Sequence, residues 1–412
     1  MLSTPEIVST WLLAGCAVGG MVARPWSLPE WLWPAGAALG LILGGLLPAR
    51  DAVEAVAGGW DVYLFIGGMM VVAELARREG VFDWLAAFAV NASRGSSGRL
   101  FAIVYGVGAL VTVFMSNDAT AVVLTPAVAV AAKRARVNPL PCLFACAMVA
   151  NAASFALPIS NPANLVVFGG GLPGLSDWVG RFALSSLAAT LATYAALRLA
   201  FARDLKEAVV GVAAPTLSPA GRAAAGSAAL AAVALLVASA ARVPLGLAAA
   251  GAGLAGLAAV CAIKRQGPFP ALGEVSWSTL ILVAGLFVVV RGLERAGLAA
   301  WLAAHSSGMK GGLADAWAGI ATALAANVAN NLPAGMLAAS ALTAAAAPPE
   351  VRAAVAVGID LGPNLTLFGS LSSVLWMLAA RREGVEVGGF AFAKVGLIAT
   401  PAALLLALAL LR

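Results

Sequence analysis

Long apolar runs, separated by short polar segments, make up most of the chain. They form two sets of six runs on either side of a polar stretch at 203–222. The first set comprises 7–23, 31–47, 60–76, 100–132, 140–170 and 178–200, and the second comprises 223–241, 245–263, 276–293, 313–346, 353–380 and 391–411. A helix needs about 20 apolar residues to cross a bilayer. The pattern therefore predicts an all-α polytopic membrane protein.

The two sets correspond in order, which indicates an internal repeat. Gly68 recurs 217 positions later as Gly285, and the string NLVVFG at 164–169 recurs 200 positions later as NLTLFG at 364–369. We therefore expect the second half of the chain to repeat the fold of the first half. The predicted division is a first repeat at 1–202, a cytoplasmic linker at 203–222 and a second repeat at 223–412.

One run in each half is too long for a single helix and is interrupted near its middle. Residues 100–132 break at Ser116–Asp118 and residues 313–346 break at Asn330–Asn331, and a proline follows each break. We interpret each run as a re-entrant hairpin, which enters the membrane, turns near its middle and leaves on the same side.

A second run in each half has a proline-containing interruption. Residues 140–170 break at 158–162, and residues 353–380 break at 362–364. We interpret these runs as spanning helices with an unwound centre, whose freed backbone groups must face a protein or water cavity because lipid cannot satisfy them. Proline kinks without function are the alternative, but four breaks at matching places favour a binding site between two repeats.

Two re-entrant hairpins leave about ten membrane crossings, five in each half, so the second repeat is inverted relative to the first. Placing both termini outside puts 17 of the 25 lysine and arginine residues on the inner side, as the positive-inside rule requires. No lysine or arginine precedes the first apolar run, so we expect a retained helix rather than a cleaved signal. The alternative is a twelve-span arrangement in which each hairpin crosses fully.

Composition narrows the class of protein. Hydrophobic residues make up 62% of the chain and charged residues 11%, with a mean hydropathy of +0.95. These values exclude a soluble enzyme, a disordered protein and a nucleic-acid binder as the main interpretation, because globular chains are about one quarter charged. The sequence has no nucleotide-binding or metalloprotease motif. We therefore expect a transporter without cofactor or bound metal, driven by an ion gradient or by another chain.

Two acidic residues, Asp118 and Asp360, lie deep in apolar runs, and both lie at predicted breaks. An intramembrane carboxylate is costly and usually faces a cavity or a partner, so we expect these two residues to carry the coupling protons. The alternative is a structural cap that accepts hydrogen bonds from the N-terminus of a half-helix, and one carboxylate can perform both roles.

Neutral polar side chains accompany the two acids at the breaks, where no lysine, arginine or histidine occurs. This set favours a small neutral or weakly charged substrate, since amides and hydroxyls offer donors and acceptors without charge. The candidate substrate-binding residues are Ser116, Asn117, Asp118, Thr120, Ser160, Asn161, Asn164, Asn330, Asn331, Asp360 and Asn364. Cys142 and Cys146 share a helix face and can ligate a soft metalloid, but free cysteine is also a common buried apolar residue.

The strings at the four breaks resemble those of the ArsB-type arsenite efflux permeases, within the ion transporter superfamily. They are SNDATAVVLTP at 116–126, ISNPAN at 159–164, ANNLP at 329–333 and DLGPNLTLFGSL at 360–371. The resemblance covers nearly the whole chain. The dicarboxylate branch of the superfamily usually carries Ser-Asn-Thr at both tips, whereas this chain has Asp118 at one tip and Asn331 at the other.

This resemblance implies export of arsenite and antimonite, as neutral trihydroxides, across a bacterial or archaeal inner membrane in exchange for protons. It also implies that a separate cytosolic arsenite-stimulated ATPase can dock on the chain. Two alternatives from the same superfamily stay open: a Na+/H+ antiporter in which Asp118 binds sodium, and a dicarboxylate carrier.

Overall fold

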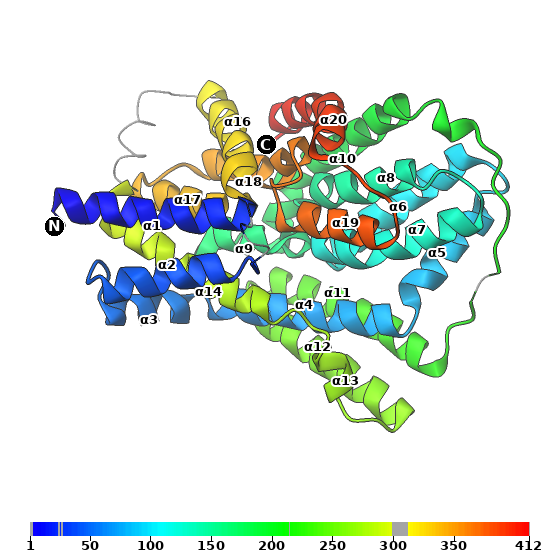
Figure 1. Cartoon of the computed structure of the whole chain (residues 1–412), viewed down its shortest axis with the longest axis horizontal. Helices are drawn as coiled ribbons and strands as arrows, with labels where there is room; N and C mark the ends of the chain where they lie inside the picture. Colours follow the sequence, from blue (N-terminus) through cyan, green and yellow to red (C-terminus); the bar gives the residue numbers. More distant parts are fainter. Residues whose placement is uncertain (1–2, 24, 26–27, 214, 299–311, 412) are drawn as a thin grey trace.

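The computed structural model describes residues 3–23, 25, 28–213, 215–298 and 312–411, and this part of the chain is helical, without a β-strand (Figure 1). The helices of the first half are α1 (Thr4–Ala23), α2 (Leu32–Leu43), α3 (Ala49–Gly58), α4 (Trp60–Arg78), α5 (Val81–Ala92), α6 (Ser97–Phe114), α7 (Thr125–Arg134), α8 (Leu140–Ala152), α9 (Pro162–Phe168) and α10 (Leu175–Ala200). Those of the second half are α11 (Pro219–Ala240), α12 (Leu245–Lys264), α13 (Phe269–Leu272), α14 (Ser278–Arg295), α16 (Gly312–Ala329), α17 (Asn331–Ala344), α18 (Pro349–Leu361), α19 (Leu371–Arg382) and α20 (Gly389–Ala409).

Within the described ranges, five helices are long and apolar enough to cross a membrane, namely α6, α10, α11, α12 and α20. The pair α3 and α4, which meet at a bend of 49°, makes a sixth if it counts as one span. The predicted all-α membrane fold is confirmed, while the number of crossings stays a prediction. The sequence analysis did not predict α3, α5 or α13, because each is too short to appear as a membrane-spanning run.

Helices end at or near the predicted interruptions, although α8 already ends at Ala152 and the interruption after α18 extends from Gly362 to Ser370. The chain leaves α6 after Phe114 and becomes helical again at Asn117, passing into a π-helical segment, η2 (Ala119–Leu124), before α7. Only Asn330 separates α16 from α17. The short 3-10 segment η3 (Pro158–Ser160) lies between α8 and α9, and the 3-10 segment η6 (Gly362–Leu365) lies between α18 and α19. The re-entrant path of the two hairpins stays a prediction.

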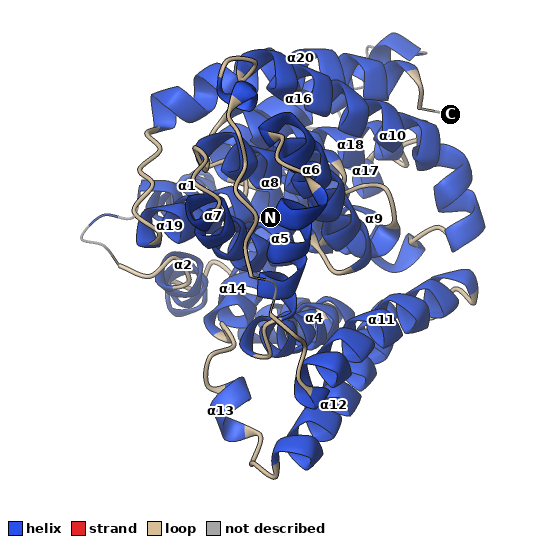
Figure 2. Cartoon of the chain, turned by 90° about the vertical axis from the view of Figure 1, so that its right-hand side faces the viewer, coloured by secondary structure: helices blue, strands red, loops and turns tan. Residues whose placement is uncertain are grey.

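The helices pack in two groups. In the first group α4 packs along α12, α2 packs along α14, and α11 packs along α12. In the second group α6 packs on α8, α16 on α18, and α10 on α20. Figure 2 shows α4, α11, α12 and α13 on one side of the molecule and α10, α16 and α20 on the opposite side. All four interrupted segments belong to the second group, so the candidate site is built mainly by that group.

Two glycines that the repeat pairs with each other lie at equivalent helix crossings. A Cβ on Gly68 of α4 would lie 2.4 Å from the carbonyl carbon of Ala249 on α12. A Cβ on Gly285 of α14 would lie 2.7 Å from the carbonyl carbon of Pro34 on α2. Each glycine therefore lets its helix approach the second helix of the other half, which supports the proposed repeat.

We expect Gly68→Val to destabilise the protein by about 1–3 kcal/mol, because the added side chain meets the α12 backbone, which cannot move aside as a flexible side chain can. Thermal unfolding in detergent measures the change. Gly251→Val is the matched control, since a Cβ on Gly251 of the same α12 meets no atom within 4 Å among the described residues. Equal melting temperatures for the two variants would contradict the close crossing.

Candidate functional site

The interruption between α6 and α7, the tip of the first predicted hairpin, combines an unusual backbone with polar side chains. Ser116 has a positive φ of 152°, and its Oγ accepts a hydrogen bond from the Ala119 amide at 3.4 Å. Thr120 is fully buried, and its Oγ1 lies 2.8 Å from Thr112 Oγ1. The hydroxyl of Thr120 is thus used within the hairpin. π-Helical turns and positive φ values at non-glycine residues concentrate at functional sites.

Asp118 connects this tip to the second half of the chain. Its Oδ1 accepts a hydrogen bond from Ser372 Oγ at 2.5 Å, near the beginning of α19. The residue before it, Asn117, is 2% exposed. Ser372 is not among the residues predicted from the sequence, although it follows directly after the string that carries the family resemblance.

The tip of the second hairpin is similar in construction. Asn330 has φ 70° and ψ 152°, a sparsely populated conformation for a residue other than glycine, and its Oδ1 accepts from the Leu332 amide at 3.4 Å. The backbone N–H of Asn331 donates to the Gly369 carbonyl at 2.9 Å. The hairpin tip is therefore fixed to the unwound segment between α18 and α19.

A hydrogen bond between Asn161 and Asp360 joins the two broken helices. Asp360 is fully buried in the last turn of α18, and its Oδ1 accepts from Asn161 Nδ2 at 2.7 Å. Asn161 is also the N-cap of α9, since its Oδ1 accepts from the Ala163 amide at 3.0 Å. Ser160 is oriented by a separate bond, from its Oγ to the Val113 carbonyl at 3.0 Å. Asp360 thus meets the other half of the chain, as Asp118 does.

Asn364 belongs to a further buried network. Its Nδ2 donates to the Met148 carbonyl at 2.9 Å, and its Oδ1 accepts from Asn151 Nδ2 at 3.0 Å. Asn151 Nδ2 also lies 3.3 Å from Ser373 Oγ, which in turn lies 2.9 Å from Ser370 Oγ. Asn151, Ser370 and Ser373 are not among the site residues predicted from the sequence. The available signal for Asn151 was an amide in an otherwise apolar helix, which requires a buried partner.

Four side-chain oxygens at the interruptions are buried and have no hydrogen-bond partner among the described residues. They are Asn117 Oδ1, Asn164 Oδ1, Asn331 Oδ1 and Asp360 Oδ2. Each parent residue is at most 3% exposed. A buried polar atom without a partner costs about 1–3 kcal/mol, so each of these oxygens is an acceptor that a bound group could use. Both halves of the chain contribute to this set.

Asp118 and Ser116 line a cavity of about 160 Å³. Its opposite wall comes from α4 and the segment before α14, and includes Glu74 and Glu274. Arg77 pairs with both glutamates, and its distance to Glu74 is 2.7 Å. Among the described residues that line this cavity, three are carboxylates and none is a lysine, arginine or histidine.

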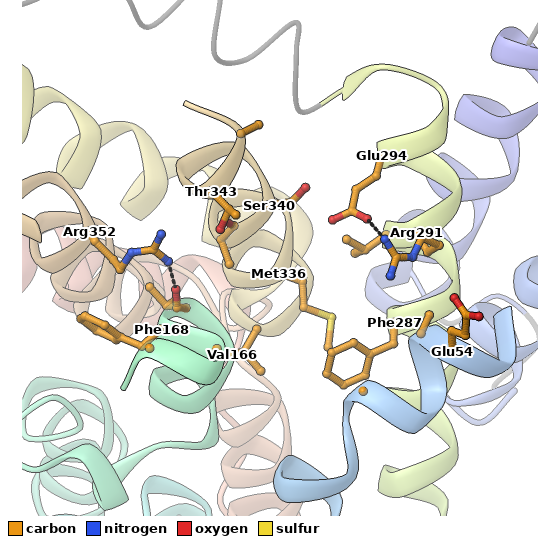
Figure 3. A pocket seen from close by; sticks show the side chains of 18 residues that line it. Glu54, Val166, Phe168, Phe287, Arg291, Glu294, Met336, Ser340, Thr343 and Arg352 are labelled. Atoms are coloured by element: carbon orange, nitrogen blue, oxygen red, sulfur yellow. Dashed lines mark hydrogen bonds and ion pairs between the residues drawn. The ribbon is translucent and has the colours of Figure 1, made fainter. Parts of the chain in front are cut away.

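A larger cavity of about 820 Å³ lies between α9, α17 and α18 on one side and α3 and α14 on the other (Figure 3). Met336 and Phe287 point toward one another across it. Arg291 pairs with Glu294 at 3.1 Å on its rim. Asp360 lines neither the large cavity nor the cavity at Asp118, so the structure does not place both acids on one open path.

The two cysteines that share a helix face, Cys142 and Cys146, are both buried in α8. The part of the chain that the structure describes contains no group of three histidine, cysteine, aspartate or glutamate side chains that could hold a metal ion. The interpretation of these thiols as buried apolar groups rather than metalloid ligands stays a prediction.

The chain matches known membrane transporters over most of their length. The arsenical pump membrane protein of Escherichia coli is 27% identical over 407 residues, which is 92% of each chain. An uncharacterized transporter of Mycobacterium tuberculosis (strain ATCC 25618 / H37Rv) is 27% identical over 367 residues, or 84% of each chain. The predicted resemblance to the arsenite efflux permeases is confirmed.

Two solved structures share the fold. The Alcanivorax borkumensis YdaH transporter has a TM-score of 0.60 at 18% identity, covering 99% of this chain and 97% of its own. Neisseria gonorrhoeae MtrF, from a class of antimetabolite efflux pumps, has a TM-score of 0.57 at 14% identity and covers 100% and 94%. A family model described as citrate transporter matches residues 26–359. This multi-pass membrane transporter therefore belongs to the citrate transporter family.

Proposed function

We propose that the chain exports arsenite and antimonite, as neutral trihydroxides, across the bacterial inner membrane in exchange for protons. The observation that carries this proposal is the set of four buried, unpartnered oxygens at Asn117, Asn164, Asn331 and Asp360. A trihydroxide presents O–H donors, and amide and carboxylate oxygens without a partner are acceptors suited to such donors. The relatives named arsenical pump membrane protein support this substrate class.

The charges around Asp118 support a neutral cargo. The side chains that line its cavity include Asp118, Glu74 and Glu274 and, within the described residues, no cation. Arg77 pairs with both glutamates but does not line the cavity, so an oxyanion would find no cation in the lining, whereas a neutral solute needs none. This lining argues against a di- or tricarboxylate cargo, although the family is named after citrate transport.

The two acids provide a means of coupling. Asp118 faces a cavity, and Asp360 keeps one buried oxygen unpartnered among the described residues, so each has an oxygen at which a proton can bind. One proton that moves through about 100 mV releases roughly 2.3 kcal/mol. At about 1.4 kcal/mol per tenfold, this energy sustains a gradient of about 40-fold for a neutral solute.

The membrane orientation is part of the proposal. Two inverted repeats with both termini outside put Arg77 and Arg78 on the inner side and Arg291 and Arg352 on the outer side. The cavity at Asp118 would then open toward the cytoplasm, and the large cavity would open outward. The arsenite-stimulated ATPase would dock on the inner side.

Everted vesicles test the proposal without an ATPase. We expect a proton gradient to drive uptake of arsenite to about 40-fold accumulation at 100 mV, a protonophore to abolish it, and sodium to have no effect. Uptake of citrate in place of arsenite would support the carboxylate carrier instead. Sodium-driven proton movement in the absence of arsenite would support the Na+/H+ antiporter.

A further inference from the structure

The half-helix α9 is attached to α18 at both of its ends. At its beginning, Asn161 Nδ2 donates to Asp360 Oδ1 at 2.7 Å. At its end, the guanidinium of Arg352 donates to the Val167 carbonyl at 2.8 Å. Arg352 and Asp360 are eight positions apart on α18, or about 12 Å along the axis, and the six steps from Asn161 to Val167 span about 9 Å. The beginning of α9 thus bonds to the end of α18, and the end of α9 bonds to the beginning of α18.

Within its own half, Asn164 of α9 donates to the Ser154 and Leu157 carbonyls, at 3.0 and 3.4 Å, and Phe168 packs against Trp178, but the backbone on either side of α9 is not α-helical. The helix follows the non-helical segment that contains Asn161 and is followed at once by Gly169–Gly171. Gly169 has φ 53° and ψ −141°, a conformation open to glycine but not to residues with a side chain. Seven residues are also too few for a helix that is stable by itself. The position of α9 therefore depends on its contacts with the neighbouring helices.

α9 stands between the large cavity and the buried asparagines. Val166, Val167 and Phe168 line the cavity, and so does Arg352 (Figure 3). Asn161 and Asn164, at the opposite end of the same helix, belong to the buried polar set. A movement of α9 would open the cavity toward these amides and would separate Asn161 from Asp360.

We propose that Arg352 is a positioning residue, which by holding the last turn of α9 keeps Asn161 on Asp360 and keeps the large cavity closed from the central amides. A guanidinium suits this place because the carbonyls at a helix C-terminus are partially negative and otherwise lack donors. The consequence for transport rests on the proposed function, whereas the closure of α9 does not.

Thiol labelling tests the closure directly in the full chain. The reporter is Ala163→Cys, at a fully buried position in α9, in a background with Cys16 and Cys261 replaced by serine. We expect Arg352→Met to accelerate its modification by N-ethylmaleimide about tenfold, which corresponds to about 1.4 kcal/mol. Arg352→Lys, which keeps a charged donor, should stay within about twofold of the parent rate.

Arg291→Met is the matched control. Arg291 lines the same cavity but bonds to Glu294 of its own helix and not to α9. It should leave the labelling rate unchanged. Equal rates for the Arg352→Met and parent proteins, or equal acceleration by Arg291→Met, would overturn the proposal. If Ala163→Cys does not fold, amide hydrogen exchange of residues 163–168, compared between Arg352→Met and the unmodified chain, tests the same closure.

A transport measurement separates this inference from the proposed function. We expect Arg352→Met to raise the apparent KM for arsenite at least fivefold, with a smaller change in maximal rate, and Arg352→Lys to restore it. Faster labelling in a protein that moves no arsenite would reject the proposed function and keep the role of Arg352. Normal labelling in an active transporter would reject that role and keep the function.

Discussion

Asp118→Asn is expected to abolish proton-driven accumulation of arsenite in everted vesicles while the protein still exchanges arsenite for arsenite. The amide keeps the shape of the side chain and still accepts the hydrogen bond from Ser372, which is 2.5 Å long in the structure. It cannot bind and release a proton near neutral pH. The accumulation ratio should therefore fall from about 40-fold at 100 mV to about one.

The arsenite-for-arsenite exchange separates a loss of proton coupling from misfolding, because a misfolded protein would lose both exchange and accumulation. Asp83→Asn is the control for the loss of one carboxylate, since Asp83 is exposed on α5 and lines neither cavity. Accumulation that persists in Asp118→Asn and remains sensitive to a protonophore would show that the coupling proton does not reside on this side chain.

Asp360→Asn should reduce arsenite accumulation at least tenfold, for a different reason. Asp360 is fully buried and bonded to Asn161 at 2.7 Å, so its charge state affects the contact between the two broken helices. An amide at 360 cannot alternate between a charged acceptor and a neutral group. Its volume is nearly that of the carboxylate, so the free energy of unfolding should change by less than about 1.5 kcal/mol.

A double variant tests whether the position of this acid matters. Asn161→Asp together with Asp360→Asn exchanges the two partners and preserves one amide, one carboxylate and the cap of α9, because aspartate is also a good N-cap. We expect accumulation to return at least in part if the pair acts as a unit. Full activity of the single variant Asp360→Asn would instead leave Asp360 with a structural role alone.

The membrane fold was predictable because it depends on local composition. Apolar runs and the residues that interrupt them decide where helices form and end, so the breaks around Asn330 and at η6 follow from asparagine, proline and glycine in the sequence. Short helices such as α3 and α5 were not predicted, since they bury one face against neighbours and do not need a run of spanning length.

Most of the candidate residues could also be predicted from the sequence, because polar side chains in apolar runs must find partners. The partners themselves could not be predicted. Ser372 on Asp118 and Asn151 on Asn364 are separated by more than 200 positions, and no periodicity relates such pairs. The contact of Arg352 with α9 could not be predicted either, since in the sequence Arg352 is an ordinary basic residue at a helix start.

The sequence by itself determined that this protein is a helical membrane transporter with polar interruptions in both halves, because hydrophobicity and helix-breaking residues act locally. Only the tertiary structure decided which half meets which: Asp118 reaches α19, Asp360 reaches the start of α9, and Arg352 reaches its end. The physical reason is that hydrogen bonds and cavities between helices depend on how distant segments pack, and packing joins residues that no local pattern connects.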